Sequence, residues 1–130
     1  RLGQRRVRER GYPYQTLIQS GAVLVNGTDP PVEDIDPVAN FYDTVSRRTA
    51  DGSVFCPEQR LTRQQALASY PVNNAYAAFE EEIKGTLTPG KLADITVLSR
   101  DIMTVPEDEI LSAKVVYTIV GGEVRYQKPG

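Results

Sequence analysis

The sequence of 130 residues contains no histidine and only one cysteine, Cys56. Without histidine, the chain lacks both the commonest general base and the commonest metal ligand of enzymes. A single cysteine excludes an internal disulfide framework and suits a reducing compartment, so we expect a cytoplasmic protein. Cys56 also has no histidine that could activate it as a nucleophile. Taken alone, this polypeptide is poorly equipped for catalysis.

Long apolar runs are absent as well. No stretch approaches the roughly 18 to 20 residues that a membrane-spanning helix needs, so we predict no membrane partner. The formal net charge of −2 provides no overall attraction to nucleic acid. Five arginines do occur in residues 1–10, with Glu9 as the only acid. No aromatic side chain is interleaved to stack on bases, so we favour a solvated helix or loop over the weaker alternative of a nucleic-acid module.

The remaining composition, 40% hydrophobic and 25% charged, is typical of an ordinary globular domain. Residues 12–21 predict a short helix, with Pro13 in the first turn and Gly21 as its stop. Residues 22–26, "AVLVN", form a continuous apolar run, which predicts a strand buried on both faces as in a parallel sheet. A helix, a glycine turn and a buried strand in this order predict half of an α/β unit.

Three further helices are predicted in the next 60 residues. Residues 30–60 are mostly irregular because they contain four prolines, although residues 39–49 can form a helix. Thr62 and Gln65 have capping-box spacing ahead of a helix that ends at Pro71, and residues 72–82 predict another. The side chains expected to face the core are Phe41, Tyr42, Val45, Ala66, Leu67, Ala75, Tyr76 and Phe79.

The periodicity changes after Gly85. A short strand is predicted through Ile95 and Leu98, and residues 114–127 read as two strands joined by a turn. Gly121 and Gly122 can both adopt positive φ, so a two-residue hairpin is natural there. We therefore predict an α/β unit over residues 1–82 and a mainly β unit over residues 83–130.

Asp29 is the candidate functional residue. It follows the predicted strand, Gly27 allows the backbone to turn, and Pro30 prevents the strand from continuing. Open α/β sheets and barrels place their chemistry at this end of a strand. The alternative is that Asp29 only caps the following turn. The nearby acids at positions 33, 34 and 36 lack the glycine and distal glutamate of a calcium loop, so a solvated loop is favoured.

The stretch "SGAVLVNGTDPPV", residues 20–32, resembles the eighth barrel strand of the amidohydrolase superfamily. The likeness continues through residues 47–110, from "RRTADG" past "LTRQQALASYPVNNAYAAFEEEIKGTLTPGKLADITVLS", and through "VVYTIVGGEVRY". The branch it resembles most contains the N-substituted formamide deformylases. This resemblance implies an α/β fold: the C-terminal part of a TIM-type (β/α)8 barrel in residues 1–82, and strands of a small flanking β-sandwich in residues 83–130.

The resemblance also implies a reaction. Members of this superfamily hydrolyse amide or related C–N bonds of small molecules with water activated by a divalent metal, and zinc is expected here. By position, Asp29 would be a metal ligand or the proton acceptor. The family's histidine pair and its other ligands would lie upstream of Arg1. One carboxylate cannot hold zinc in the usual arrangement of three or four ligands.

The alternative is that the chain by itself is a non-catalytic fragment, or a folding or interaction module that lacks the metal ligands. Its expected partner is then the remainder of the barrel. Without that partner, the apolar segment 22–26 and open sheet edges would favour aggregation or self-association, including homo-oligomers.

Overall fold

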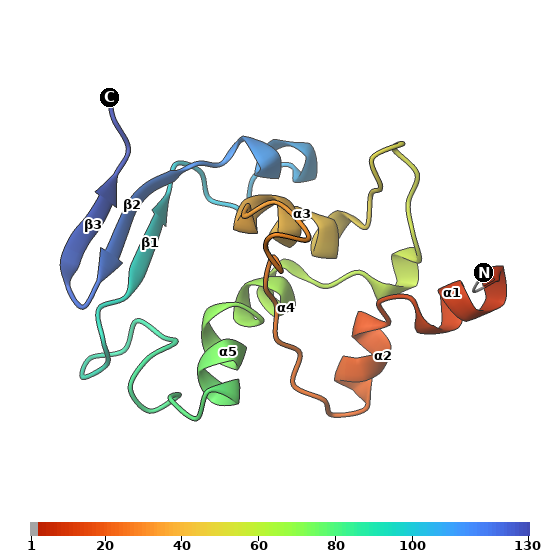
Figure 1. Ribbon diagram of the computed structural model, residues 1–130, viewed down its shortest axis with the longest axis horizontal. Coiled ribbons are helices and arrows are strands. Elements are labelled where there is room, and N and C mark those ends of the chain that lie inside the picture. The colour runs from red at the N-terminus through yellow and green to blue at the C-terminus, as the bar shows by residue number, and fades with distance from the viewer. Residues whose placement is uncertain (1–2) are drawn as a thin grey trace.

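The computed structural model describes residues 3–130, and Figure 1 shows three strands at one end of the molecule, α1 at the other, and α3 and α4 between them. The elements are α1 (Gln4–Arg10), α2 (Tyr14–Gln19), α3 (Pro37–Ser46), η1 (Pro57–Gln59), α4 (Arg63–Ala68), α5 (Pro71–Ala77), β1 (Ile95–Leu98), η2 (Glu107–Ser112), β2 (Val115–Val120) and β3 (Glu123–Gln127).

The core lies where α3 meets η2 and α4. Phe41 and Val45 point inward from α3, as predicted, and are 3% and 7% exposed. Ala66 of α4 and Ile110 of η2 are completely buried beside them. Because η2 belongs to the predicted β unit and α3 to the predicted α/β unit, residues from both units share this core. The full cluster is Val38, Phe41, Val45, Leu61, Ala66, Ile102, Ile110 and Ala113.

Local signals for helix ends are confirmed. Thr62 caps α4 in a capping box with Gln65, so each side chain accepts a backbone N–H of the other. Pro13 immediately precedes α2, and Gly21 follows it with a φ of 86°. The arginine-rich start forms α1, whose side chains are mostly exposed, as expected for a solvated helix.

The sheet is antiparallel and has the order β1-β2-β3. Ile95 pairs with Ile119, and Val120 pairs with Glu123 next to the hairpin turn. Gly121 and Gly122 both have positive φ, so the predicted two-residue hairpin is confirmed. Asp94 accepts the N–H of Gly121 at 2.8 Å, and this contact joins the start of β1 to the hairpin turn.

The predicted buried strand at residues 22–26 is not formed. The segment is irregular, and the side chains of Val23 and Val25 are 50% and 47% exposed. A strand requires a neighbour to complete its ladder, and residues 3–130 supply none at this place. The only sheet of the described chain is antiparallel, so the structure is a mixed helix and strand fold that does not itself contain the barrel.

Three residues predicted to face the core are instead exposed. Leu67, Tyr76 and Phe79 are 41%, 54% and 92% exposed, respectively. For Phe79, the reason lies in the length of α5, which ends at Ala77. Phe79 follows with a φ of 59°, so it no longer continues the helical face of Ala75. Helical spacing predicts a common face only while the helix continues. Leu67 in α4 and Tyr76 in α5 lie on helix faces that the described residues leave uncovered.

In the part of the chain that the structure describes, no helix has the length and apolar character that crossing a bilayer requires.

Gly85 gives a test of how the loop after α5 packs. A Cβ at this position would lie 2.7 Å from the Cβ of Ala75 and 2.9 Å from the Pro71 carbonyl oxygen. Gly90 has a nearly identical φ, 94° against 93°, but open space around it. We expect Gly90→Ala to lower the free energy of unfolding by about 1 kcal/mol. Gly85→Ala should cost about 1–3 kcal/mol more because it adds a clash. Urea unfolding of the two variants measures the difference, and equal losses would contradict this packing.

Candidate functional site

Asp29 lies at the end of an extended segment that is held from one side by helices. The Nδ2 of Asn73 in α5 donates to the carbonyl oxygen of Leu24 at 2.7 Å, and the Nδ2 of Asn74 donates to that of Asn26 at 3.0 Å. The N–H of Asn26 donates to the carbonyl of Ser69 at 3.0 Å. These bonds occupy the backbone groups of alternate residues, as the ladder of a neighbouring strand would.

The opposite edge of this segment is open. Within residues 3–130, the backbone groups of Val23 and Val25 have no hydrogen-bonding partner. Their side chains are about half exposed, while Leu24 between them packs against the core. The segment therefore presents free backbone donors and acceptors together with apolar side chains, which is what an edge strand offers to a neighbour.

Asp29 itself sits at the tip of the following loop. Its φ is 53°, a left-handed conformation that aspartate tolerates better than most residues. Its carbonyl oxygen accepts the N–H groups of Val32 at 2.9 Å and Glu33 at 3.4 Å, which closes a turn. The side chain is exposed, and none of the described residues hydrogen-bonds to its carboxylate. The turn is thus closed by backbone hydrogen bonds alone, and the Asp29 carboxylate remains available to bind another group.

The Asp29 loop, residues 28–36, returns to the body of the molecule at α3. Asp36 caps this helix by accepting the N–H groups of Val38 at 2.9 Å and Ala39 at 3.2 Å. Asn40, one turn into α3, donates from Nδ2 to the Gly27 carbonyl at 2.7 Å. Of the clustered acids, Asp36 therefore has a structural role, whereas Glu33 and Asp34 are exposed.

Burial shapes the electrostatics beside this loop. Burial raises the pKa of Tyr70 to about 12, and Tyr14, Asp43 and Asp36 add to the effect. The Tyr70 hydroxyl lies 3.5 Å from the Pro37 carbonyl, next to the start of α3. The pKa of Asp43 is raised by burial and by the negative charge of Glu33. A further negative charge at this face is therefore disfavoured, and the phenol of Tyr70 stays neutral at physiological pH.

Arg47 fixes the other end of α3. It is 7% exposed and its guanidinium lies 5.0 Å from the ring centroids of both Tyr14 and Phe55. Its Nε donates to the Phe55 carbonyl at 3.0 Å. Burial raises the pKa of Tyr14, and the nearby positive charge of Arg47 partly opposes that rise. This cation–π arrangement ties α2 and the loop at Phe55 to α3.

The residues that the structure describes do not assemble a metal site. Among the side chains of the described residues, no three of His, Cys, Asp or Glu lie close enough to share an ion. Asp29 is a single oxygen donor, whereas a zinc site takes three or four ligands. The residues present therefore do not by themselves fit a zinc centre.

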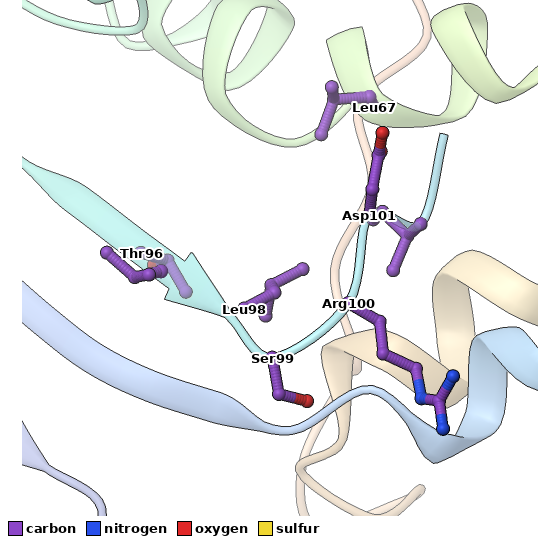
Figure 2. A pocket seen from close by; sticks show the side chains of 8 residues that line it. Leu67, Thr96, Leu98, Ser99, Arg100 and Asp101 are labelled. Carbon is purple, nitrogen blue, oxygen red and sulfur yellow. The ribbon is translucent and has the colours of Figure 1, made fainter. Parts of the chain in front are cut away.

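An open hollow of about 480 Å³ lies between the end of β1 and α4 (Figure 2). It is lined by Leu67 and residues 96–102, and Asp29 is not among them. Its charged groups are already engaged: Arg100 pairs with Glu109 at 2.8 Å, and the carboxylate of Asp101 accepts from the backbone of Met103 and from the hydroxyl of Thr104. This hollow therefore offers no free catalytic group.

Sequence reasoning selected Asp29 as a candidate and missed the asparagines that hold its segment. Asn40, Asn73 and Asn74 all lie within helices, where asparagine is a poor helix former because its side chain competes for backbone hydrogen bonds. An asparagine pair inside a helix was the available signal. Its targets, the carbonyls of residues 24 and 26, lie nearly 50 positions earlier in the chain and could not be assigned from spacing.

The chain is similar to known proteins over nearly all its length. The family model described as Amidohydrolase family matches residues 1–126. Protein LONG AFTER FAR-RED 3 of Arabidopsis thaliana is 34% identical over 127 residues, which cover 97% of this chain and 22% of that protein. N-substituted formamide deformylase of Arthrobacter pascens is 28% identical over 119 residues, which cover 92% of this chain and 22% of that protein.

A solved structure is similar in fold. The crystal structure of an amidohydrolase from Thermotoga maritima MSB8 matches with a TM-score of 0.68 at 17% identity, covering 88% of this chain and 26% of that one. At this identity, the likeness concerns the fold alone. The chain thus spans about a quarter of the length of the proteins it matches.

Tyr70 gives a test of the environment beside the loop. Its pKa is raised from 10.0 to about 12 by folding, so the unfolded chain loses this proton first as the pH rises. The stability that Tyr70 contributes is fully present below pH 10 and is lost as the pH approaches 12. We expect Tyr70→Phe to flatten the alkaline decline in the free energy of unfolding. Tyr126→Phe, at an exposed position on β3, serves as the control. Urea unfolding at a series of pH values measures both, and identical profiles would rule out a buried Tyr70.

Proposed function

The chain belongs to the amidohydrolase family, and from that premise we propose that it is the C-terminal part of a metal-dependent hydrolase that cleaves an amide or related C–N bond of a small molecule. Residues 1–82 would supply the last strand and helices of a (β/α)8 barrel. Residues 83–130 would supply strands of a flanking β-sandwich. Family membership supports hydrolysis, and the name of the deformylase relative supports an amide-type substrate.

The observation that carries this proposal is the placement of Asp29. An extended segment is held on one edge by hydrogen bonds from helices and leads directly to the exposed carboxylate of Asp29. The turn at Asp29 is closed by its backbone carbonyl, so the carboxylate is not used in the turn. Barrel enzymes place catalytic side chains at this position, past the carboxyl end of a strand. We assign Asp29 to the catalytic centre as a metal ligand or as the proton acceptor, since a carboxylate can perform either task.

The metal would be held jointly with residues outside this sequence. A divalent ion, zinc by resemblance to the family, needs three or four ligands, and no three potential ligand side chains lie together among the described residues. The remaining ligands would therefore come from the remainder of the barrel. The open edge at Val23 and Val25 supports this division, because it presents unpaired backbone and apolar side chains where a neighbouring strand would lie.

The same division defines what the isolated chain would be. A polypeptide whose described residues assemble no group of three metal ligands is proposed to have no hydrolytic activity by itself and to act only after it packs against the remainder of the barrel. In this sense the fragment is a folding and interaction unit, while the complete protein is the enzyme.

Asp29→Asn tests the assignment in the complete gene product. The substitution keeps the shape of the side chain but removes its charge and its capacity to accept a proton. We expect kcat/KM for hydrolysis of an N-substituted formamide to fall by at least about 10²-fold, the range of a lost acid–base group. The thermal midpoint should change little because the side chain is exposed.

Asp34→Asn, an exposed change in the same loop, is the matched control and should retain activity. Release of the free amine, followed by chromatography, measures both variants. An Asp29→Asn protein that hydrolyses at the wild-type rate would exclude Asp29 from the catalytic centre. No turnover by the wild-type protein would instead direct the search to other C–N substrates before the variants are compared.

The isolated chain of residues 1–130 is expected to self-associate or aggregate. Val23, Val25 and Phe79 are 50%, 47% and 92% exposed, and the segment at residues 22–26 has a free edge. Apolar surface next to unpaired backbone favours association between copies. Sedimentation velocity at several concentrations measures the oligomeric state. A monodisperse monomer at every concentration would contradict this prediction.

A further inference from the structure

One side chain closes the loop that carries Asp29, and we propose that this residue, Asn40, positions the Asp29 carboxylate for hydrolysis. The inference rests on the proposed function of Asp29 and adds a second residue to it. Asn40 is assigned no contact with substrate or metal, and it acts through the backbone of Gly27.

The bond from Asn40 joins the two ends of the Asp29 loop. The chain leaves the braced segment at Gly27 and re-enters the helical body at α3, and the Nδ2 of Asn40 donates to the Gly27 carbonyl at 2.7 Å. Asn40 is itself held in the first turn of α3, where its N–H donates to the Asp36 carbonyl at 3.1 Å. Asp36 in turn caps that helix. The bond therefore anchors Gly27, two residues before Asp29, to a fixed point.

Asp29 depends on this anchor because its own side chain has none. In the described part of the chain, nothing hydrogen-bonds to its carboxylate, and only its carbonyl is engaged, by Val32 and Glu33. Those two bonds move with the loop, so they do not fix it relative to the scaffold. Gly27 has no side chain, and its N–H is held only by the side chain of the preceding residue, Asn26, at 2.9 Å. Among the described residues, the bond from Asn40 is the one that ties the Gly27 carbonyl to the helical body, so its loss lets this peptide rotate. Rotation there would displace the carboxylate that follows.

The residue type at position 40 supports a role for its side chain. Asparagine is a weak helix former, and Asn40 lies within the first half of α3. Its amide crosses the mouth of the loop to a carbonyl 13 positions earlier and does not bond within the helix. A misplacement of about 1 Å at a catalytic group can cost about 10²-fold in rate, which is the scale on which such an anchor matters.

The test compares Asn40→Ala with Gln15→Ala in the complete gene product, using an N-substituted formamide as the probe. Gln15 is the control because its side-chain amide also donates to a backbone carbonyl at 2.7 Å, that of Arg60, away from the Asp29 loop. It donates in addition to the side-chain oxygen of Gln65 at 2.8 Å, so its loss removes at least as much stabilising contact as the loss of Asn40. We expect Asn40→Ala to lower kcat by about 10- to 100-fold while KM changes by less than about threefold. Gln15→Ala should lower the thermal midpoint at least as much as Asn40→Ala does and leave kcat within about threefold of the wild type.

A second variant guards against misfolding. Asn40→Asp keeps the size of the side chain but replaces the donor with an acceptor, so it should lower kcat to a similar extent as Asn40→Ala. If both Asn40 variants keep the wild-type kcat, or if kcat falls equally in the Asn40 and Gln15 variants, then Asn40 has no positioning role.

Asp29→Asn, measured in parallel, separates the two proposals. A loss of activity in Asp29→Asn with full activity in both Asn40 variants overturns only the inference about Asn40. Full activity in Asp29→Asn overturns the assignment of Asp29 to the catalytic centre. The positioning role of Asn40 is then overturned as well, because it depends on that assignment.

Discussion

The extended segment before Asp29 depends on side-chain amides that take the place of a neighbouring strand. Backbone carbonyls in folded proteins are paired with other backbone groups, with side chains or with water. Asn73 and Asn74 satisfy the carbonyls of Leu24 and Asn26, and Asn40 satisfies that of Gly27. With one edge satisfied in this way, the segment stays extended although no sheet forms around it, and Asp29 is carried to its exposed position.

The brace is effective because its helices are part of one packed body. α3 supplies Asn40 on its exposed side and Phe41 and Val45 to the core, where they meet Ile110 of η2. Residues on both sides of position 83 therefore share a single apolar cluster, while β1, β2 and β3 extend from it as a separate layer (Figure 1). The position of the Asp29 loop is thus coupled to packing that extends to the second half of the chain.

The chain corresponds to one segment of the proteins it matches. It belongs to the amidohydrolase family and spans about a quarter of the length of the relatives it matches. Within the residues that the structure describes, no group of ligands for a metal is assembled. The chain presents the exposed carboxylate of Asp29, a free backbone edge at Val23 and Val25, and exposed apolar side chains. A free edge of this kind is a surface on which a neighbouring strand can pair.

Residue patterns alone determined the features that depend on near neighbours in the chain. The capping box of Thr62 and Gln65, the stop at Gly21 and the turn at Gly121 and Gly122 are set by contacts within a few residues, so each was predictable. Family membership was predictable too, because its motifs run along the whole chain. Tertiary structure decided the rest. Residues 22–26 have every preference of a buried strand, but strand formation requires a distant partner that the described chain does not provide. In its place the fold brought asparagines from two helices to that backbone, and because such pairing depends on three-dimensional proximity, no local pattern could reveal it.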